Sequence, residues 1–374
     1  MILQQTVATV IKARGLDVKT VSERAGIPED LLKRAVIGKA ELTDMQIRGI
    51  ADELAVPVSA FFAKQQPDLF PIVDFRRTNP RISKVSKGTL QAISFVESFS
   101  NTFSSIGMKF DVDSSAKKVS SQFAASDAIE LARVWRTKWG LTTQDQLNFG
   151  SANGVYKSLR EFLEGLGVAI IHHSFRDGEV GGIYMQVGEG PHTIVINTTQ
   201  SSKARKLFTL AHEFCHFLLR LSGVSNPSII KNDIENFCNK FAANLLAPKD
   251  LIFHAMRRYG YSASTENDQV RIFAKRLGIS QEALLIRFVE LDFISTSQYS
   301  QWKSQFHSFV PEGDMSDGAG GGSSDPIQNK KTEFGSTLIS AFTAAVKKGW
   351  LDEVDVYRIS GLKPKYQNQL FDVG

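Results

Sequence analysis

The segment Lys206–Leu219, KLFTLAHEFCHFLL, restricts the fold of this 374-residue chain more than any other stretch does. Its apolar residues recur every three or four positions, which predicts a helix with one buried face. On that helix His212 and His216 are one turn apart and project from the same face. Two imidazoles at this spacing are typical ligands of a tetrahedral metal, most often Zn²⁺. Glu213 is displaced by about a third of a turn, so we expect it beside the metal's water as a general base.

A catalytic zinc has three protein ligands and one open position, so a neighbouring element should supply the third ligand. The segment Asp233–Ala247, DIENFCNKFAANLLA, reads as a second amphipathic helix that ends before Pro248. Glu235 and Asn239 are one turn apart on its polar stripe. We predict Glu235 as the third ligand, with Asn239 supporting the ligands from outside the coordination shell. The alternatives are a solvated surface glutamate and a core helix whose histidines bond to backbone carbonyls.

Two separated signatures in this part of the chain resemble the ImmA/IrrE metallopeptidases of bacteria, mobile elements and phages. One is the run Ile194–Leu219 with its H-E-x-x-H, and the other is E-x-x-(small)-N-x-F-A-A-x-L-L-x-P at Glu235–Pro248. The similarity covers about Gly150–Leu291. It implies a zincin-like peptidase domain, with a small sheet beside the helix that carries H-E-x-x-H.

The resemblance implies a role for each residue of the two motifs. His212, His216 and Glu235 would bind one Zn²⁺ per chain, with Mn²⁺ as the alternative metal, and Glu213 would be the catalytic base. Members of this family often cleave a repressor or a regulatory protein, so the implied partner is a protein substrate of that kind. Cys238 stands where the family commonly has alanine, which is a change between two small residues.

The composition is ordinary for a soluble globular protein, with 42% hydrophobic and 22% charged residues. No apolar run reaches the roughly 18 residues of a membrane span, and the N-terminus lacks a secretory signal. We therefore expect a cytoplasmic protein without membrane contact. The two cysteines of the chain, Cys215 and Cys238, fit a reducing compartment. They are expected as small buried packing residues, with an auxiliary thiolate ligand as the alternative.

The first 66 residues read as short helices separated by glycine. Residues Leu16–Lys39 contain two expected helices joined by A-G-I-P, an arrangement typical of a helix-turn-helix. The segment resembles the Cro/repressor (XRE-like) helix-turn-helix, particularly in Gly26-Ile27 and in GIADELAVPVSAFF. The expected helices span Leu3–Arg14, Val18–Arg24, Pro28–Val36, Thr43–Leu54 and Val58–Phe62.

The charge of this region gives only weak support to DNA binding. Residues 1–66 carry nine Lys and Arg against eight Asp and Glu, whereas affinity for DNA grows with the number of phosphates neutralised. Lys33, Arg34 and Lys39 are the predicted DNA contacts, and a solvated helix face is the alternative for each. A basic run after the connector Pro67–Pro80 extends the candidate DNA-binding region to residues 1–88, unless that run is a loop that solvates itself. Its basic residues are Arg76, Arg77, Arg81, Lys84 and Lys87. A homodimer is compatible with this module, because many such proteins bind two-fold operators.

The region before the His-containing helix predicts a small sheet. Helices are predicted over Lys87–Trp139 and Val155–Leu166, a strand over Val168–His172, and a paired arrangement of Gly182–Val187 with Thr193–Asn197. Either of the two paired strands is a candidate edge for binding extended substrate by strand addition. Tyr184 is the candidate oxyanion donor. His172, His173 and His192 are expected at strand ends or in loops, not as ligands.

We therefore predict an α+β fold that is mainly helical. A five-helix helix-turn-helix domain spans residues 1–66, a basic connector with linking helices spans 67–149, the metallopeptidase domain spans 150–295, and a linker with a helical tail spans 296–374. Within the tail, DMSDGAGGGSSD predicts a flexible linker over Glu312–Lys331. Helices follow over Thr337–Val346 and Leu351–Leu362, and Pro364 ends the pattern. The tail is expected to dock on the rest of the chain or on a partner.

These features predict a zinc-dependent endopeptidase coupled to a DNA-binding helix-turn-helix, which cleaves a repressor or regulatory partner to control transcription. The biological setting would be a mobile element, a toxin-antitoxin system or a stress response. The alternative is a transcriptional regulator, or an antitoxin-like DNA-binding protein, whose peptidase fold serves as a sensor or scaffold with little turnover. The complete set of His212, Glu213, His216 and Glu235 favours the enzyme, because a scaffold has no need for the base.

Overall fold

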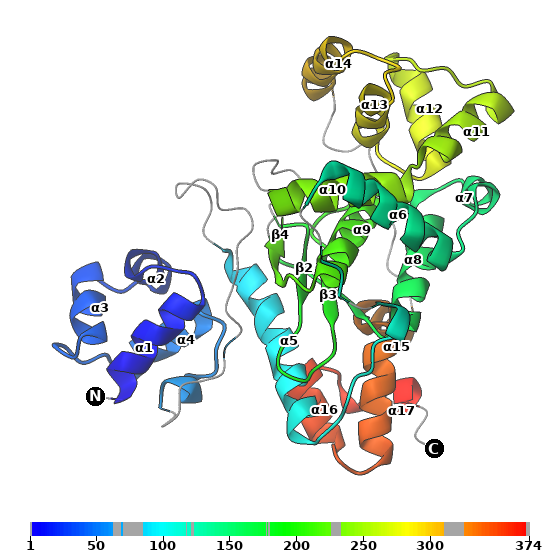
Figure 1. Cartoon of the computed structure of the whole chain (residues 1–374). Coiled ribbons are helices and arrows are strands. Elements are labelled where there is room, and N and C mark those ends of the chain that lie inside the picture. Colours follow the sequence, from blue (N-terminus) through cyan, green and yellow to red (C-terminus); the bar gives the residue numbers. More distant parts are fainter. Residues whose placement is uncertain are drawn as a thin grey trace.

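The protein is mainly helical, with one small sheet near its centre (Figure 1). The computed structural model describes residues 2–62, 69, 85–116, 118–120, 123–176, 178, 180–225, 233–309 and 325–371. The mainly helical α+β fold expected from the sequence is confirmed. Among these residues, no helix combines the length and the apolar character that crossing a bilayer would require.

The N-terminal region is a cluster of short helices around its own apolar core (Figure 1). All five expected helical segments are present within a few residues of their predicted bounds, the last as a 3₁₀ turn. Gly26 ends the second helix with a left-handed φ of 66° and donates its N–H to the carbonyl of Ser22, a conformation that glycine adopts readily. The elements are α1 Ile2–Ala13, α2 Val18–Ala25, α3 Glu29–Val36, α4 Asp44–Glu53 and η1 Val58–Phe61.

A single long helix, α5 (Lys87–Ser105), joins this N-terminal core to the sheet (Figure 1). Its first turn adds Leu90 to the N-terminal core, while later residues such as Phe99 pack on the sheet. Arg14, directly after α1, donates to both carboxylate oxygens of Glu97 on α5 at 2.8 and 2.7 Å, and both side chains are buried. Because breaking such a pair leaves a buried charge without its partner, it holds the N-terminal region firmly against α5.

The sheet has four strands in the order β1-β3-β2-β4. Strand β3 runs parallel to β1, and β2 runs antiparallel to both β3 and β4, so the expected pairing of β2 with β3 is confirmed. The prediction that β2 or β3 offers a free edge for strand addition is wrong. Each is paired on both sides, because the short strand β4 takes the outer side of β2. The strands are β1 Ala169–His173, β2 Gly182–Met185, β3 Thr193–Asn197 and β4 Gly223–Ser225.

Helices cover both faces of the sheet. Helix α9 (Lys203–Leu219) lies against β2 and β3, with α8 and α10 beside it, and α5 covers the opposite face together with the C-terminal tail. Trp135 and Trp139 of α6 are buried in the core that includes α9. The remaining elements of this part are η2 Ser114–Ala116, α6 Ala125–Trp139, α7 Thr143–Phe149, α8 Ala152–Gly165, α10 Asp233–Leu246, α11 Lys249–Tyr259, α12 Asn267–Leu277, α13 Gln281–Glu290 and α14 Thr296–Phe309.

The C-terminal tail docks on the sheet of its own chain. Helix α15 (Pro326–Lys347) lies along β1, and its kink at Gly335 brings the backbone against the strand. A Cβ at Gly335 would lie 2.7 Å from the carbonyl oxygen of Ile170, and its φ of 72° favours glycine as well, so any side chain there would push the tail away. The later helices are α16 Glu353–Ser360 and α17 Pro364–Phe371.

Two expectations for the tail need correction or restriction. The expectation that Pro364 ends the helical pattern is wrong, because Pro364 opens α17, where its fixed φ and missing N–H fit the first turn. The expected linker over residues 312–331 is helical from Pro326 onward, since α15 begins there. Residues 312–324 of that linker lie outside the described residues, as do the connector residues 67 and 68 and 70–80.

Candidate metal centre

Helix α9 carries the H-E-x-x-H motif between the sheet and α10. Ser202 caps its N-terminus by accepting a hydrogen bond from the backbone N–H of Arg205, and apolar side chains such as Phe214 and Phe217 bury its length. His212, Glu213 and His216 are all at most 1% exposed. Burying three polar side chains on one helix is costly unless each has a partner, so this stretch is built around polar contacts.

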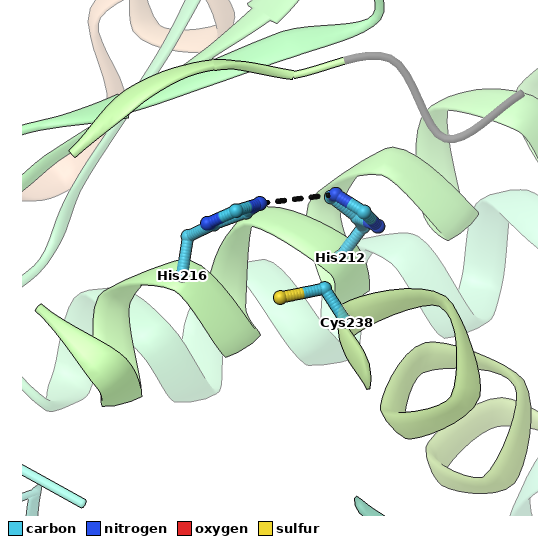
Figure 2. Close-up of side chains that lie close together, drawn as sticks. All are labelled: His212, His216 and Cys238. Carbon is cyan, nitrogen blue, oxygen red and sulfur yellow. Dashed lines mark hydrogen bonds between the residues drawn. The ribbon is translucent and has the colours of Figure 1, made fainter. Parts of the chain in front are cut away.

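The two histidines of the motif turn their Nε2 atoms toward each other at 3.1 Å, as Figure 2 shows. The carboxylate of Glu235 on α10 reaches both rings, with Oε1 3.1 Å from His216 Nε2 and Oε2 3.4 Å from His212 Nε2. Donor atoms bound at about 2.0–2.2 Å in a tetrahedral arrangement lie about 3.3–3.6 Å apart. The three side chains therefore converge at nearly the separations that a zinc ion requires, and the donor set fits the metal.

Asn239 contacts the ring nitrogen of His212 that points away from His216 and Glu235. Its Oδ1 lies 3.0 Å from His212 Nδ1, and it comes from α10 one turn after Glu235. When Nδ1 donates to this oxygen, the lone pair of Nε2 is left pointing at Glu235 and His216. Asn239 thus stands where an outer partner sets the tautomer and the orientation of a metal-binding histidine.

Cys238 is a competing candidate for the third ligand. Ligand atoms of His212, His216 and Cys238 lie within 4.8 Å of one another, and Figure 2 shows the thiol beside the two rings. The carboxylate oxygens of Glu235 lie 3.1 and 3.4 Å from the two Nε2 atoms, near the separation that a bound metal imposes. Burial and the neighbouring Cys215 raise the pKa of the Cys238 thiol well above its usual range, which disfavours the thiolate that binds metals. Both cysteines are buried and form no disulfide.

The electrostatics of the centre favour an ionised Glu235. Burial by itself raises the pKa of this carboxyl group, but hydrogen bonds from His212 and His216 and their charge outweigh that effect and lower the pKa to about 2. Since a metal cation at the same place would act in the same direction, the carboxylate is ready to serve as an anionic ligand at neutral pH.

The structure does not bring Tyr184 to this cluster. Its hydroxyl lies 2.7 Å from Nδ1 of His192, and its ring packs against Phe217, one turn beyond Glu213 on α9. Burial raises the pKa of this phenol and lowers that of His192 to about 4. Tyr184 is therefore a neutral, buried hydroxyl in contact with a neutral imidazole.

The predicted DNA contacts lie on or just after α3, and their charges are largely matched within that helix. Lys33 Nζ is 2.7 Å from Glu29, and Arg34 Nε is 3.0 Å from Asp30, while Lys39 is exposed after the end of the helix. Lys87 pairs with Asp52 and Glu53 of α4. The other four basic residues predicted near it, Arg76, Arg77, Arg81 and Lys84, lie outside the described residues.

Sequence reasoning missed one residue at the centre, Gly182 of β2. A Cβ placed there would lie 3.0 Å from Cγ of Glu213. The available signal was a glycine inside a predicted strand, which often marks a close approach of another group. A cavity of about 430 Å³ occurs elsewhere, at the end of β1 under α15. Its lining includes His172 and His173, which end β1 as predicted and are remote in sequence from the cluster.

Comparison with known proteins supports the peptidase assignment for one part of the chain. The family model described as the IrrE N-terminal-like domain, of peptidase family M78, matches residues 163–289. No curated protein and no solved structure gave a significant match. The matched residues run from the end of α8 through the sheet, α9 and α10 to α13. They include all the candidate metal ligands and Glu213. The match of residues 163–289 supports the ImmA/IrrE resemblance and a metallopeptidase-like function for this part of the chain.

Proposed function

We propose that this protein is a zinc-dependent endopeptidase. The observation that carries the proposal is the convergence of three side chains, in which the Nε2 atoms of His212 and His216 and the two carboxylate oxygens of Glu235 lie at separations of 3.1 to 3.4 Å. The match of residues 163–289 to a peptidase family supports it independently. Two helices that serve only as structure would have no reason to bury two histidines and two glutamates against one another.

Each residue of the centre has a distinct role in this proposal. His212, His216 and Glu235 hold the ion, and Asn239 keeps His212 in the tautomer that presents Nε2. A bound Zn²⁺ supplies Lewis acidity and lowers the pKa of water toward about 7. Glu213 accepts the proton of the attacking water and later passes it to the nitrogen of the leaving amine.

An oxyanion donor is the remaining requirement for peptide hydrolysis. Tyr184 lies on the same strand as Gly182 and two residues further along, so both project from the same face of β2. Its hydroxyl would serve only after leaving His192 Nδ1, which it contacts at 2.7 Å. We therefore propose Tyr184 as the oxyanion donor, on the condition that substrate binding turns its hydroxyl away from His192 and toward the substrate.

Metal analysis of the purified protein tests this proposal. We expect about one zinc per chain in the wild type, and a large loss in His212→Ala, because two of the three donors cannot close a tetrahedral site. His173→Ala is a matched control, since His173 lies at the end of β1 and not in the cluster. If the wild type binds neither zinc nor manganese when these are supplied, the endopeptidase proposal is wrong.

We further propose that the N-terminal helices bind DNA and bring the peptidase to a repressor or regulatory protein, which it cleaves. The motif resemblance of α2 and α3 and the buried Arg14–Glu97 pair, which ties this region to α5, support the coupling. The weak net charge of α3 means that binding would rely on few phosphate contacts.

Salt dependence is the most direct test of DNA binding. The double variant Lys33→Ala/Arg34→Ala should reduce the slope of log K against log salt by about 0.9 for each phosphate that is no longer neutralised. Fluorescence anisotropy with a labelled random-sequence duplex measures this slope, because the phosphate contribution does not depend on sequence. The double variant Lys347→Ala/Lys348→Ala in the tail removes the same charge elsewhere. An unchanged slope in the α3 variant, or an equal change in both, would exclude α3 as the DNA-binding element.

A second candidate function is a regulator whose peptidase fold turns over little. Two observations favour it: the four side chains of the centre are buried, and β4 pairs with the side of β2 that an extended substrate would need. DNA binding without cleavage of any partner, in a protein that holds its zinc, would support this candidate over the endopeptidase.

A further inference from the structure

We propose that Gly182 is a positioning residue for Glu213, an inference that rests on the proposed peptidase function. Gly182 opens β2 and faces α9, the helix that carries the base. The φ of Gly182 lies outside the left-handed region that favours glycine, so its backbone does not require this residue. Glycine is required at this position because there is no space for a side chain.

Three atoms surround the place where a Cβ would stand. They are Cγ2 of Thr209 at 2.7 Å, Cγ of Glu213 at 3.0 Å and the carbonyl oxygen of Val195 at 3.1 Å. Thr209 and Glu213 are one turn apart on α9 and both are buried, so neither has free room to withdraw. Because Cγ lies near the start of the glutamate side chain, moving it displaces the whole carboxylate.

The strand cannot relieve the contact by moving. Gly182 is paired with Ile196 of β3 on one side and with Ser225 of β4 on the other. Its neighbour Gly181 also accepts a hydrogen bond from the backbone N–H of Asn197 at 3.0 Å. A side chain at position 182 would therefore push on the two side chains of α9 that its Cβ meets, Thr209 and Glu213.

The metal ligands should be spared by such a displacement. Neither histidine supplies one of the three atoms nearest to a Cβ at position 182, and His212 and His216 contact each other, Glu235 and Asn239 rather than the sheet. The absence of a side chain at position 182 therefore leaves room for Glu213, the proposed base, and does not affect the proposed metal ligands. This separation makes the inference testable, because metal content and base position can be measured independently.

Gly182→Ala should retain the cobalt or zinc stoichiometry of the wild type and lose about 100-fold in kcat, since a displacement of about 1 Å can cost that much. KM should change by less than about two-fold, because the interaction that is removed is one of the transition state. In the cobalt-substituted protein, the visible absorption spectrum should depart from the wild type in the same direction as that of Glu213→Gln. Fluorescein-labelled casein is the substrate for the kinetic measurement.

Two further variants separate positioning from packing. Gly182→Ala/Thr209→Ser removes the methyl group that makes the 2.7 Å contact, so it should regain thermal stability without regaining kcat. Gly165→Ala is the control, because a Cβ there meets nothing within 4 Å. Full activity in the Thr209→Ser double variant, or a wild-type spectrum and kcat in Gly182→Ala, overturns the inference but not the peptidase. A wild type that binds no metal or does not cleave casein, by contrast, overturns the proposed function and this inference with it.

Discussion

Glu213→Gln should remove peptide-bond cleavage while leaving the zinc content at the wild-type value. The amide has nearly the same size as the carboxylate, so the substituted side chain fits the same space beside Gly182. It cannot accept the proton of the attacking water, however, and general-base catalysis typically contributes 10²- to 10⁴-fold in rate. The expected result is a loss of kcat of about that size with little change in KM.

Parallel measurements of casein cleavage and zinc content test this expectation. Glu130→Gln is the control, because Glu130 is an exposed residue of α6 whose carboxylate pairs with nearby Arg133, away from the metal cluster. Cleavage at the wild-type rate by zinc-loaded Glu213→Gln would show that another group is the base. Loss of zinc in this variant would instead place Glu213 among the ligands.

The second large effect concerns the identity of the third ligand. Glu235→Gln should weaken zinc binding by more than about 100-fold, because loss of even an outer partner of a ligand typically costs 10- to 100-fold. Cys238→Ser should weaken it by less than about ten-fold, since the thiol is not a ligand in the proposed site and its raised pKa disfavours the thiolate that binds metals. The carboxylate oxygens of Glu235 lie 3.1 and 3.4 Å from the two Nε2 atoms, near the separations of bound ligands.

Competition with a chromogenic chelator measures both affinities under the same conditions. The two substitutions lie one turn apart on α10 and both positions are buried, so each variant is a control for general damage to that helix. The reverse order of effects, with Cys238→Ser losing zinc and Glu235→Gln retaining it, would assign the third position to the thiol. Equal losses in both variants would mean that α10 itself has been disturbed.

Much of the fold was predictable because its signals are local. The apolar periodicity around His212 predicted α9, and the polar stripe with Glu235 predicted the facing side of α10, since a helix places residues one turn apart on one side. The capped and glycine-punctuated N-terminal segments were equally local, so all five were found near their expected bounds. The pairing of β2 with β3 followed from two short apolar runs with a turn between them.

The errors concern contacts between segments that are distant in sequence. Strand β4 has only three residues, and its pairing with β2 bridges about forty positions of chain. No periodic pattern can be read from so short a strand. Pro364 was interpreted as a stop although it opens α17, because proline is compatible with both positions.

The sequence by itself determined the predicted type of chemistry. The spacing of H-E-x-x-H on one helix, followed by a glutamate on the next helix, predicts metal ligands with a general base beside them. Only the tertiary structure decided which atoms meet. It brought the carboxylate of Glu235 within 3.4 Å of both histidines. It also paired the hydroxyl of Tyr184 with His192, and it placed the backbone of Gly182 beside the side chain of Glu213. The physical reason is that residue spacing sets the face on which a side chain lies, whereas the packing of one element on another sets its partner.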